Sequence, residues 1–174
     1  MEENKLEAFW DGAVRGDAEA QFQMAMKYIY GDGVDEDNEK AVELLHKASM
    51  QGHIEAQYNL GVCYHYGYGT KVDYKIAFEL YKKSALQGYA KGKCLVGFFY
   101  FHGLYVKQDY AEAIKWFLEA EEQNDAAAEY WLGVCYANGY GVTQNKAEAI
   151  KWYQKSASQG YPYAQKALED ILRM

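Results

Sequence analysis

The sequence predicts an all-α fold built from stacked helix-turn-helix repeats. Glycine recurs every 36 residues at Gly16, Gly52, Gly88 and Gly160, and Asn124 completes the series. The 174-residue chain contains only one proline, which favours helices joined by glycine over a loop-rich β fold. Three further columns keep the same interval: Gly31, Gly67, Gly103 and Gly139; Tyr28, Tyr64, Tyr100 and Tyr136; and Ala41, Ala77, Ala113 and Ala149.

Each repeat is predicted to contain two helices. In the first copy, one helix covers 18–30, because Ala20, Met24 and Tyr28 fall on one face, and it ends at Gly31, which accommodates the left-handed conformation. The second helix begins after a residue that satisfies free backbone N–H groups. These N-cap residues are Asp37, Asp73, Asp109 and Asn145.

The repeats divide residues 1–174, taken as one domain, without insertion or deletion. We expect a half-repeat at 6–15 and a capping helix at 160–174, which cover the apolar ends of the stack. Between them lie four full repeats, numbered one to four: 16–51, 52–87, 88–123 and 124–159.

Two segments carry a family resemblance. The segments AQYNLGVCYHYGYGTKVDYKIAFELYKKSALQG (56–88) and AEYWLGVCYANGYGVTQNKAEAIKWYQKSASQG (128–160) resemble the Sel1-like repeat, a relative of the tetratricopeptide repeat. The resemblance implies a right-handed α/α solenoid whose first helices line a concave surface. It also implies an adaptor or scaffold that binds another protein or peptide, without catalysis.

Repeat three departs from this pattern. Tyr105 stands where the other repeats have Gly33, Gly69 and Gly141. If this position requires a positive φ, the loop of repeat three is strained or reshaped. A smaller departure of repeat three is Glu121 in place of a small residue, and in repeat one Ala25 replaces a core glycine.

The aromatic run CLVGFFYFHGLY (94–105) supplies the candidate site. The repeat register places it on a first helix, and helical spacing turns Phe98, Phe101 and His102 toward the expected concave surface. Equivalent positions in repeats one and two are also apolar or aromatic. The predicted protein-binding residues are Met26, Tyr30, His65, Tyr66, Phe98, Phe101 and His102.

Core packing is the alternative explanation for these aromatic residues, since neighbouring helices could bury Phe98 and Phe101. Repeat four, however, forms the same helix with Val134 and Ala137 at these positions, which favours a binding surface. Two carboxylates, Glu19 and Glu55, begin the first helices of repeats one and two. Their negative charges would attract a basic peptide. Alternatively, they are solvated charges that stabilise the helix starts through the helix dipole.

No pattern indicates a metal, a cofactor or an enzyme. His65, His102, Cys63 and Cys94 lack the spacing of a zinc site, so we interpret them as groove or core residues. The Gly-x-Gly pairs end helices rather than bind phosphate, and no nucleophile has a His/Asp partner. Two other histidines, His46 and His53, are expected to be exposed near a helix end and a junction.

Charge and composition restrict the classes of partner and the cellular location that we expect. A net charge of −7 and a pI near 5.1 disfavour nucleic acid. No apolar run is long enough for a membrane span, and three scattered cysteines favour a reducing, cytoplasmic location. We therefore predict a cytoplasmic monomer that acts as an adaptor or scaffold. The alternative is an immunity-type inhibitor that binds and blocks a bacterial toxin or effector.

Overall fold

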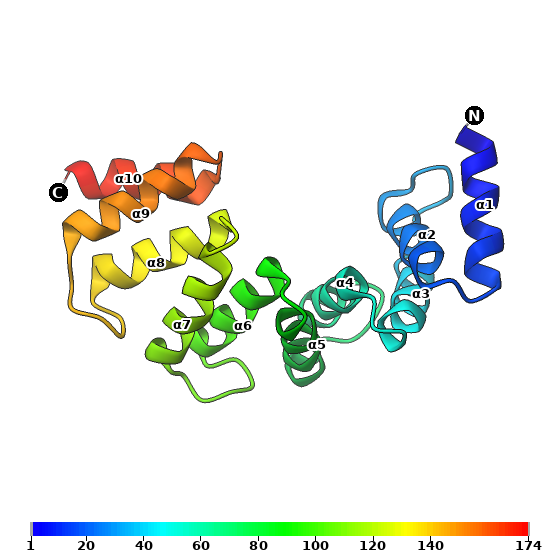
Figure 1. Cartoon of the computed structure of the whole chain (residues 1–174), viewed down its shortest axis with the longest axis horizontal. Helices are drawn as coiled ribbons and strands as arrows, with labels where there is room; N and C mark the ends of the chain where they lie inside the picture. The colour runs from blue at the N-terminus through cyan, green and yellow to red at the C-terminus, as the bar shows by residue number, and fades with distance from the viewer. Residues whose placement is uncertain (1, 174) are drawn as a thin grey trace. The chain divides into compact units, whose positions relative to one another are not determined.

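The computed structural model describes residues 2–173, which form ten helices and no strand (Figure 1). This confirms the all-α repeat fold. The helices are α1 (Glu2–Val14), α2 (Ala18–Tyr30), α3 (Asn38–Met50), α4 (Ile54–Tyr66), α5 (Tyr74–Leu86), α6 (Ala90–His102), α7 (Tyr110–Glu121), α8 (Ala126–Asn138), α9 (Lys146–Ser158) and α10 (Pro162–Arg173).

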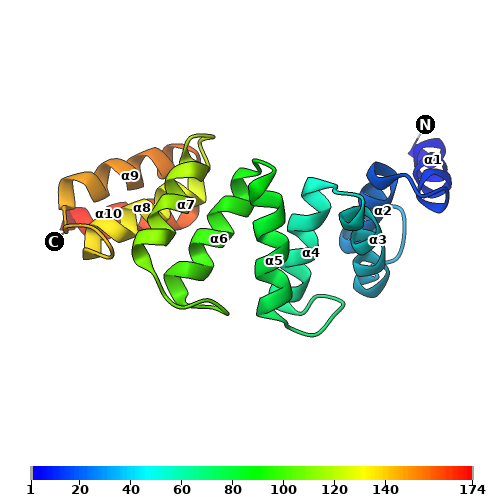
Figure 2. The ribbon, with the colours of Figure 1, turned by 60° about the horizontal axis from the view of Figure 1, so that its bottom comes forward.

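The chain forms two compact units that divide between Gln87 and Gly88. The N-terminal unit contains α1–α5 and the C-terminal unit contains α6–α10. Within each unit, every helix packs against the next one along the chain. Figure 2 shows α4 and α5 side by side as one such hairpin. The first helices of the repeats are therefore α2, α4, α6 and α8, and the second helices are α3, α5, α7 and α9.

Helix ends follow the predicted caps. The side chains of Asp37, Asp73, Asp109 and Asn145 each accept a hydrogen bond from the backbone N–H three residues later. Each first helix of the four repeats ends at a glycine in the left-handed conformation. The repeat length therefore has a local cause, because the same start and stop residues return every 36 positions.

The loop of repeat three contains a strained residue. Tyr105 has φ 62°, whereas Gly33, Gly69 and Gly141 have φ 77°, 63° and 68°. This confirms that the position requires a positive φ. An L-residue pays about 1–2 kcal/mol there, because its Cβ crowds the following carbonyl oxygen.

The core depends on close approach between paired helices. A glycine of the first helix lies against an aromatic ring of the second: Gly61 against Tyr81, Gly97 against Phe117 and Gly133 against Tyr153. A Cβ added to these glycines would lie 2.8, 2.7 and 2.5 Å from the ring, respectively. In repeat one, Ala25 replaces the glycine, and Leu45 replaces the ring at the matching position of α3. Both are fully buried, so the smaller Leu45 leaves room for the Ala25 methyl group.

Polar ladders accompany this core in the N-terminal unit. Gln51 donates to Gln21 over 2.9 Å, and Gln87 donates to Gln57 over 2.8 Å. Each pair spans 30 residues and joins the end of a second helix to the first helix of the same repeat. The recurring glutamines are thus satisfied internally and need no partner protein.

Candidate protein-binding site

Six rings of the C-terminal unit form one contact network. This C-terminal aromatic cluster consists of Phe98, Phe101, His102, Tyr110, Trp131 and Tyr140. Trp131 of α8 lies 5.4 Å from Phe98, 5.0 Å from Phe101 and 5.4 Å from His102, measured between ring centroids. Tyr110 stacks on Tyr140 at 4.8 Å. The structure therefore brings together the three residues predicted on α6.

Exposure separates these residues into two layers. His102 is exposed, Phe98 and Trp131 are half-buried, and Tyr140 is 37% exposed. Phe101 is only 7% exposed, so the expectation that it faces a groove is wrong. Its ring contacts the rings of Trp131, Tyr110 and Tyr140. Phe101 therefore packs beneath the solvent-exposed rings of the cluster and is not itself a surface residue.

Trp131 is the site residue that sequence reasoning missed. The prediction followed three positions of each first helix and compared only equivalent residues. Trp131 belongs to another column, with Gln23, Asn59 and Leu95, and reaches the cluster from the next first helix. An aromatic residue in a column that is polar in repeats one and two was the available indication.

His102 is held in its neutral form by its surroundings. Although much of its side chain is exposed, partial burial of the ring against Phe98 and Trp131 lowers the pKa of His102. At neutral pH its imidazole is therefore uncharged, with one nitrogen that donates and one that accepts. The cluster is apolar but carries hydrogen-bonding groups.

The N-terminal unit has its own aromatic cluster, formed by His65, Tyr66, Tyr68, Tyr74 and Tyr81. Tyr66 stacks on His65 at 4.3 Å and on Tyr68 at 5.7 Å. The predicted surface residue His65 is buried at 8% exposure, and its Nδ1 lies 3.3 Å from the Tyr81 hydroxyl. His65 is therefore a packing residue, whereas Tyr66 and Tyr68 are more than half exposed.

The other predicted contacts of the N-terminal unit lie on α2. Tyr30 is 73% exposed, and Met26 is half-buried against the core. His53, which we expected to be exposed, is instead held in place. It caps α4 through Ala56, stacks on Phe22 at 4.7 Å and pairs with Glu19 at 3.1 Å.

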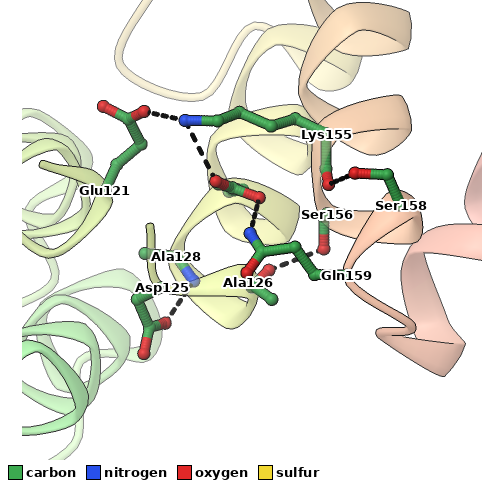
Figure 3. Close-up of polar contacts among 9 residues, drawn as sticks. Glu121, Asp125, Ala126, Ala128, Lys155, Ser156, Ser158 and Gln159 are labelled. Atoms are coloured by element: carbon green, nitrogen blue, oxygen red, sulfur yellow. Dashed lines mark hydrogen bonds and ion pairs between the residues drawn. The ribbon is translucent and has the colours of Figure 1, made fainter. Parts of the chain in front are cut away.

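One buried carboxylate, Glu129, lies at the contact between α8 and α9. Glu129 on α8 is fully buried, and Lys155 on α9 reaches it at 3.1 Å. Lys155 also pairs with Glu121 (Figure 3). Gln159 donates to Glu129 over 2.7 Å. The Oε2 of Glu129 accepts from Gln159, whereas its buried Oε1 accepts no hydrogen bond and is compensated by the charge of Lys155. Both neighbours lie on or at the end of α9, so the carboxylate joins helices. This contact also explains the unusual Glu121, which pairs with Lys155 across neighbouring repeats.

Repeat three contains the same ion pair with its charges exchanged. Lys93 on α6 lies 3.2 Å from Glu119 on α7. Adding 36 to these two numbers gives Glu129 and Lys155. The two repeats therefore place an ion pair at one structural position but reverse its direction.

The cysteines and histidines provide no metal site among residues 2–173, where no three candidate ligands converge. Cys63, Cys94 and Cys135 are buried and unpaired. Burial raises the pKa of Cys63 to about 11 and that of Cys135 to about 12, so neither is a reactive thiolate at neutral pH. No helix in this described part is long and apolar enough to cross a bilayer.

Comparison with protein families decides the classification. The profile described as Sel1 repeat matches four consecutive segments, 18–53, 54–89, 90–125 and 126–161. The chain belongs to the Sel1 repeat family. Proteins of this family commonly mediate protein–protein interactions, and the repeat scaffold is generally non-catalytic. A comparison with curated proteins found no match.

Solved structures agree with this assignment. The Sel1 repeat protein from Oxalobacter formigenes is 31% identical, with a TM-score of 0.91 over 95% of this chain and 66% of that one. The Escherichia coli protein c5321, a protective antigen of uropathogenic strains, is 37% identical, with a TM-score of 0.85 over 94% of this chain and 35% of that one. This Sel1 repeat chain therefore spans between about a third and two thirds of these relatives.

A more distant similarity involves an immunity protein. Pa5087 from Pseudomonas aeruginosa is 19% identical, with a TM-score of 0.50 over 88% of this chain and 72% of that one. At this identity the comparison shows a shared fold alone.

Proposed function

We propose that this chain is a non-catalytic adaptor or scaffold that binds another protein through aromatic surfaces of its first helices. The observation that carries the proposal is the outer layer of the C-terminal aromatic cluster, formed by Phe98, His102 and Trp131. These side chains exceed what the fold requires, since Val134 and Asn138 replace Phe98 and His102 in repeat four. Aromatic side chains are enriched in the cores of protein interfaces.

The test uses substitutions taken from sister repeats. Trp131→Gln copies Gln23, and His102→Asn copies Asn138, so both changes are compatible with the repeat. Wild type and the double variant serve as baits in native lysate, and each captured protein is then titrated in purified form. Circular dichroism and thermal unfolding check that both baits are folded.

The matched control is Leu118→Gln, which removes an exposed apolar residue on a second helix. We expect a partner that binds wild type and the control but loses affinity for the double variant. A partner that is lost only with Leu118→Gln would place the binding surface on the second helices and contradict the proposal.

The similarity to the immunity protein Pa5087 does not support the alternative that this chain is a toxin inhibitor, because it shows a shared fold alone. The affinity of the purified pair distinguishes the two roles. We expect an adaptor to bind at about micromolar Kd, whereas a toxin inhibitor binds at about nanomolar Kd or tighter.

A further inference from the structure

The C-terminal aromatic cluster exposes hydrogen-bond donors that the protein does not use. Within residues 2–173, neither the indole nitrogen of Trp131 nor the ring nitrogens of His102 have a hydrogen-bond partner, and neither group is buried. Trp116 provides the contrast in the same unit, since its indole N–H donates to Glu112 over 3.1 Å. Two free polar groups therefore lie within an apolar surface, with their ring centroids 5.4 Å apart.

The two helices that carry Phe98, His102 and Trp131 offer no exposed carboxylate to a basic partner. The helix α6 has no carboxylate, and the single carboxylate of α8 is Glu129, which is fully buried and paired with Lys155. Of the lysines on α6, Lys91 is exposed and Lys93 is paired with Glu119. A basic peptide would find no exposed carboxylate on these two helices, in contrast to the exposed Glu19 and Glu55 of the N-terminal unit.

The free donors indicate the backbone conformation of the partner. In a bound helix most backbone carbonyl groups already accept hydrogen bonds within the helix, so few of them can accept from N–H donors of the apolar surface. An extended strand that adds to a sheet edge is excluded on α6 and α8, because helices present no free edge. A polyproline II segment has no internal hydrogen bonds, so its carbonyls remain available, and its proline rings pack on aromatic faces.

We propose that Phe98, His102 and Trp131 form a docking site for a proline-rich peptide in the polyproline II conformation. The aromatic rings contact proline side chains, and the indole N–H of Trp131 donates to a peptide carbonyl. Neutral His102 supplies a second donor. This inference rests on the proposed function, because it names the partner class of the same surface.

The experiment measures binding of three synthetic decapeptides to the full chain. One has prolines at every third position with neutral residues between them, which places the prolines on one edge of a polyproline II helix. The second is a neutral amphipathic peptide that forms an α-helix, and the third is a lysine-rich version of the first. Calorimetry gives the affinities, and ¹⁵N NMR follows the four indole N–H signals.

We expect the neutral proline-rich peptide to bind and to shift the indole signal of Trp131. Trp131→Gln should weaken its affinity at least about tenfold, and His102→Asn should weaken it less. The matched control Trp116→Gln should leave the affinity unchanged, because that indole N–H is already bonded to Glu112. If Trp131→Gln unfolds, the exposed His102→Asn and the NMR shift still test the site.

The contradicting results separate this inference from the proposed function. Preference for the helical peptide at Trp131 would overturn the polyproline assignment while leaving an aromatic binding surface in place. Equal binding of the lysine-rich peptide would overturn the charge argument. Absence of binding by all three peptides would overturn the inference. The proposed function fails only if the captured partners also bind the Trp131→Gln/His102→Asn variant as tightly as they bind wild type.

Discussion

The N-terminal and C-terminal units place different side chains on the same 36-residue register. Where repeats one and two join their helices through Gln21–Gln51 and Gln57–Gln87, repeats three and four carry Lys93 and Glu129 in the column of Gln21 and Gln57. These two charged residues pair with Glu119 and Lys155, respectively. Gln159 of repeat four still donates to the residue of this column, Glu129, whereas Gln123 of repeat three donates to the carbonyl of Gly88. The comparison teaches that the same backbone accommodates either an amide or a charged residue in this column.

The exposed surfaces differ in the same way. First helices of the N-terminal unit begin with the exposed carboxylates Glu19 and Glu55 and end with the exposed Tyr30 and Tyr66. Those of the C-terminal unit have no exposed carboxylate and carry the cluster around Trp131. The first helices of each unit, taken by themselves, therefore present chemically distinct surfaces, which would suit different partner segments.

The largest expected effect comes from removing the cation beside the buried carboxylate. Lys155→Met removes the cation beside the buried Glu129 and leaves only the hydrogen bond from Gln159, so we expect a loss of about 3 kcal/mol in the free energy of unfolding. Chemical denaturation measures it. Adding Glu129→Gln, the residue found at the equivalent positions 21 and 57, should restore most of the loss.

The control for this prediction is Lys83→Met, at the position of repeat two that is equivalent to Lys155. Lys83 is exposed and has no ion pair in the described chain, so its replacement should leave the free energy of unfolding nearly unchanged. A loss as large in the control as in Lys155→Met would show that the buried charge is not the cause.

Next in size is the test of the glycine–aromatic contact. Gly97→Ala places a Cβ 2.7 Å from the Phe117 ring, and overpacking of this kind costs about 1–3 kcal/mol. Phe117→Leu in the same chain should recover stability, because Ala25 and Leu45 form this combination in repeat one. A double-mutant cycle by thermal unfolding gives the coupling. Additive losses would contradict the idea that the two positions change as a pair.

A smaller effect, of opposite sign, is expected at the strained loop. Tyr105→Gly should raise the free energy of unfolding by about 1 kcal/mol, since glycine adopts φ 62° without a Cβ penalty. The mirror change Gly33→Ala, at φ 77° and with the added Cβ in ordinary van der Waals contact with Leu6 at 3.5 Å, should lower stability by a similar amount. Differential scanning calorimetry compares the two. Destabilisation by Tyr105→Gly would mean that contacts of the tyrosine outweigh its strain.

The smallest effect concerns pH. Burial lowers the pKa of His65 below 6.5, so the native state favours the neutral imidazole. As pH falls below 6.5, the unfolded state binds the proton more readily, and the stability contributed by neutral His65 is lost. We expect His65→Phe, which copies Phe101, to lose stability less steeply between pH 7 and 5 than wild type. Parallel curves for the two proteins would show that His65 does not contribute to the pH dependence.

The sequence predicted the fold far better than the surface. Caps such as Asp37 and the glycine stops act locally, so their 36-residue spacing was sufficient to place the helices. The sister glycines of Tyr105 left either a strained or a reshaped loop open, and the structure has the strained one, with φ 62°. Exposure, in contrast, depends on which neighbouring helix covers a side chain. The column that contains His65 and Phe101 was judged exposed from helical angle alone, but aromatic neighbours, among them Tyr81 and Trp131, bury both residues.

The reversed ion pairs have a consequence for how the chain assembles. Nearly identical repeats allow a first helix to associate with the wrong second helix, a known hazard in repeat proteins. If α6 paired with α9, Lys93 would meet Lys155, and if α8 paired with α7, Glu129 would meet Glu119. Both mistakes would bring like charges together at a partly buried contact, whereas the native hairpins join opposite charges. We expect the Lys93–Glu119 and Glu129–Lys155 pairs to favour, during folding, the association of each first helix with the second helix of its own repeat.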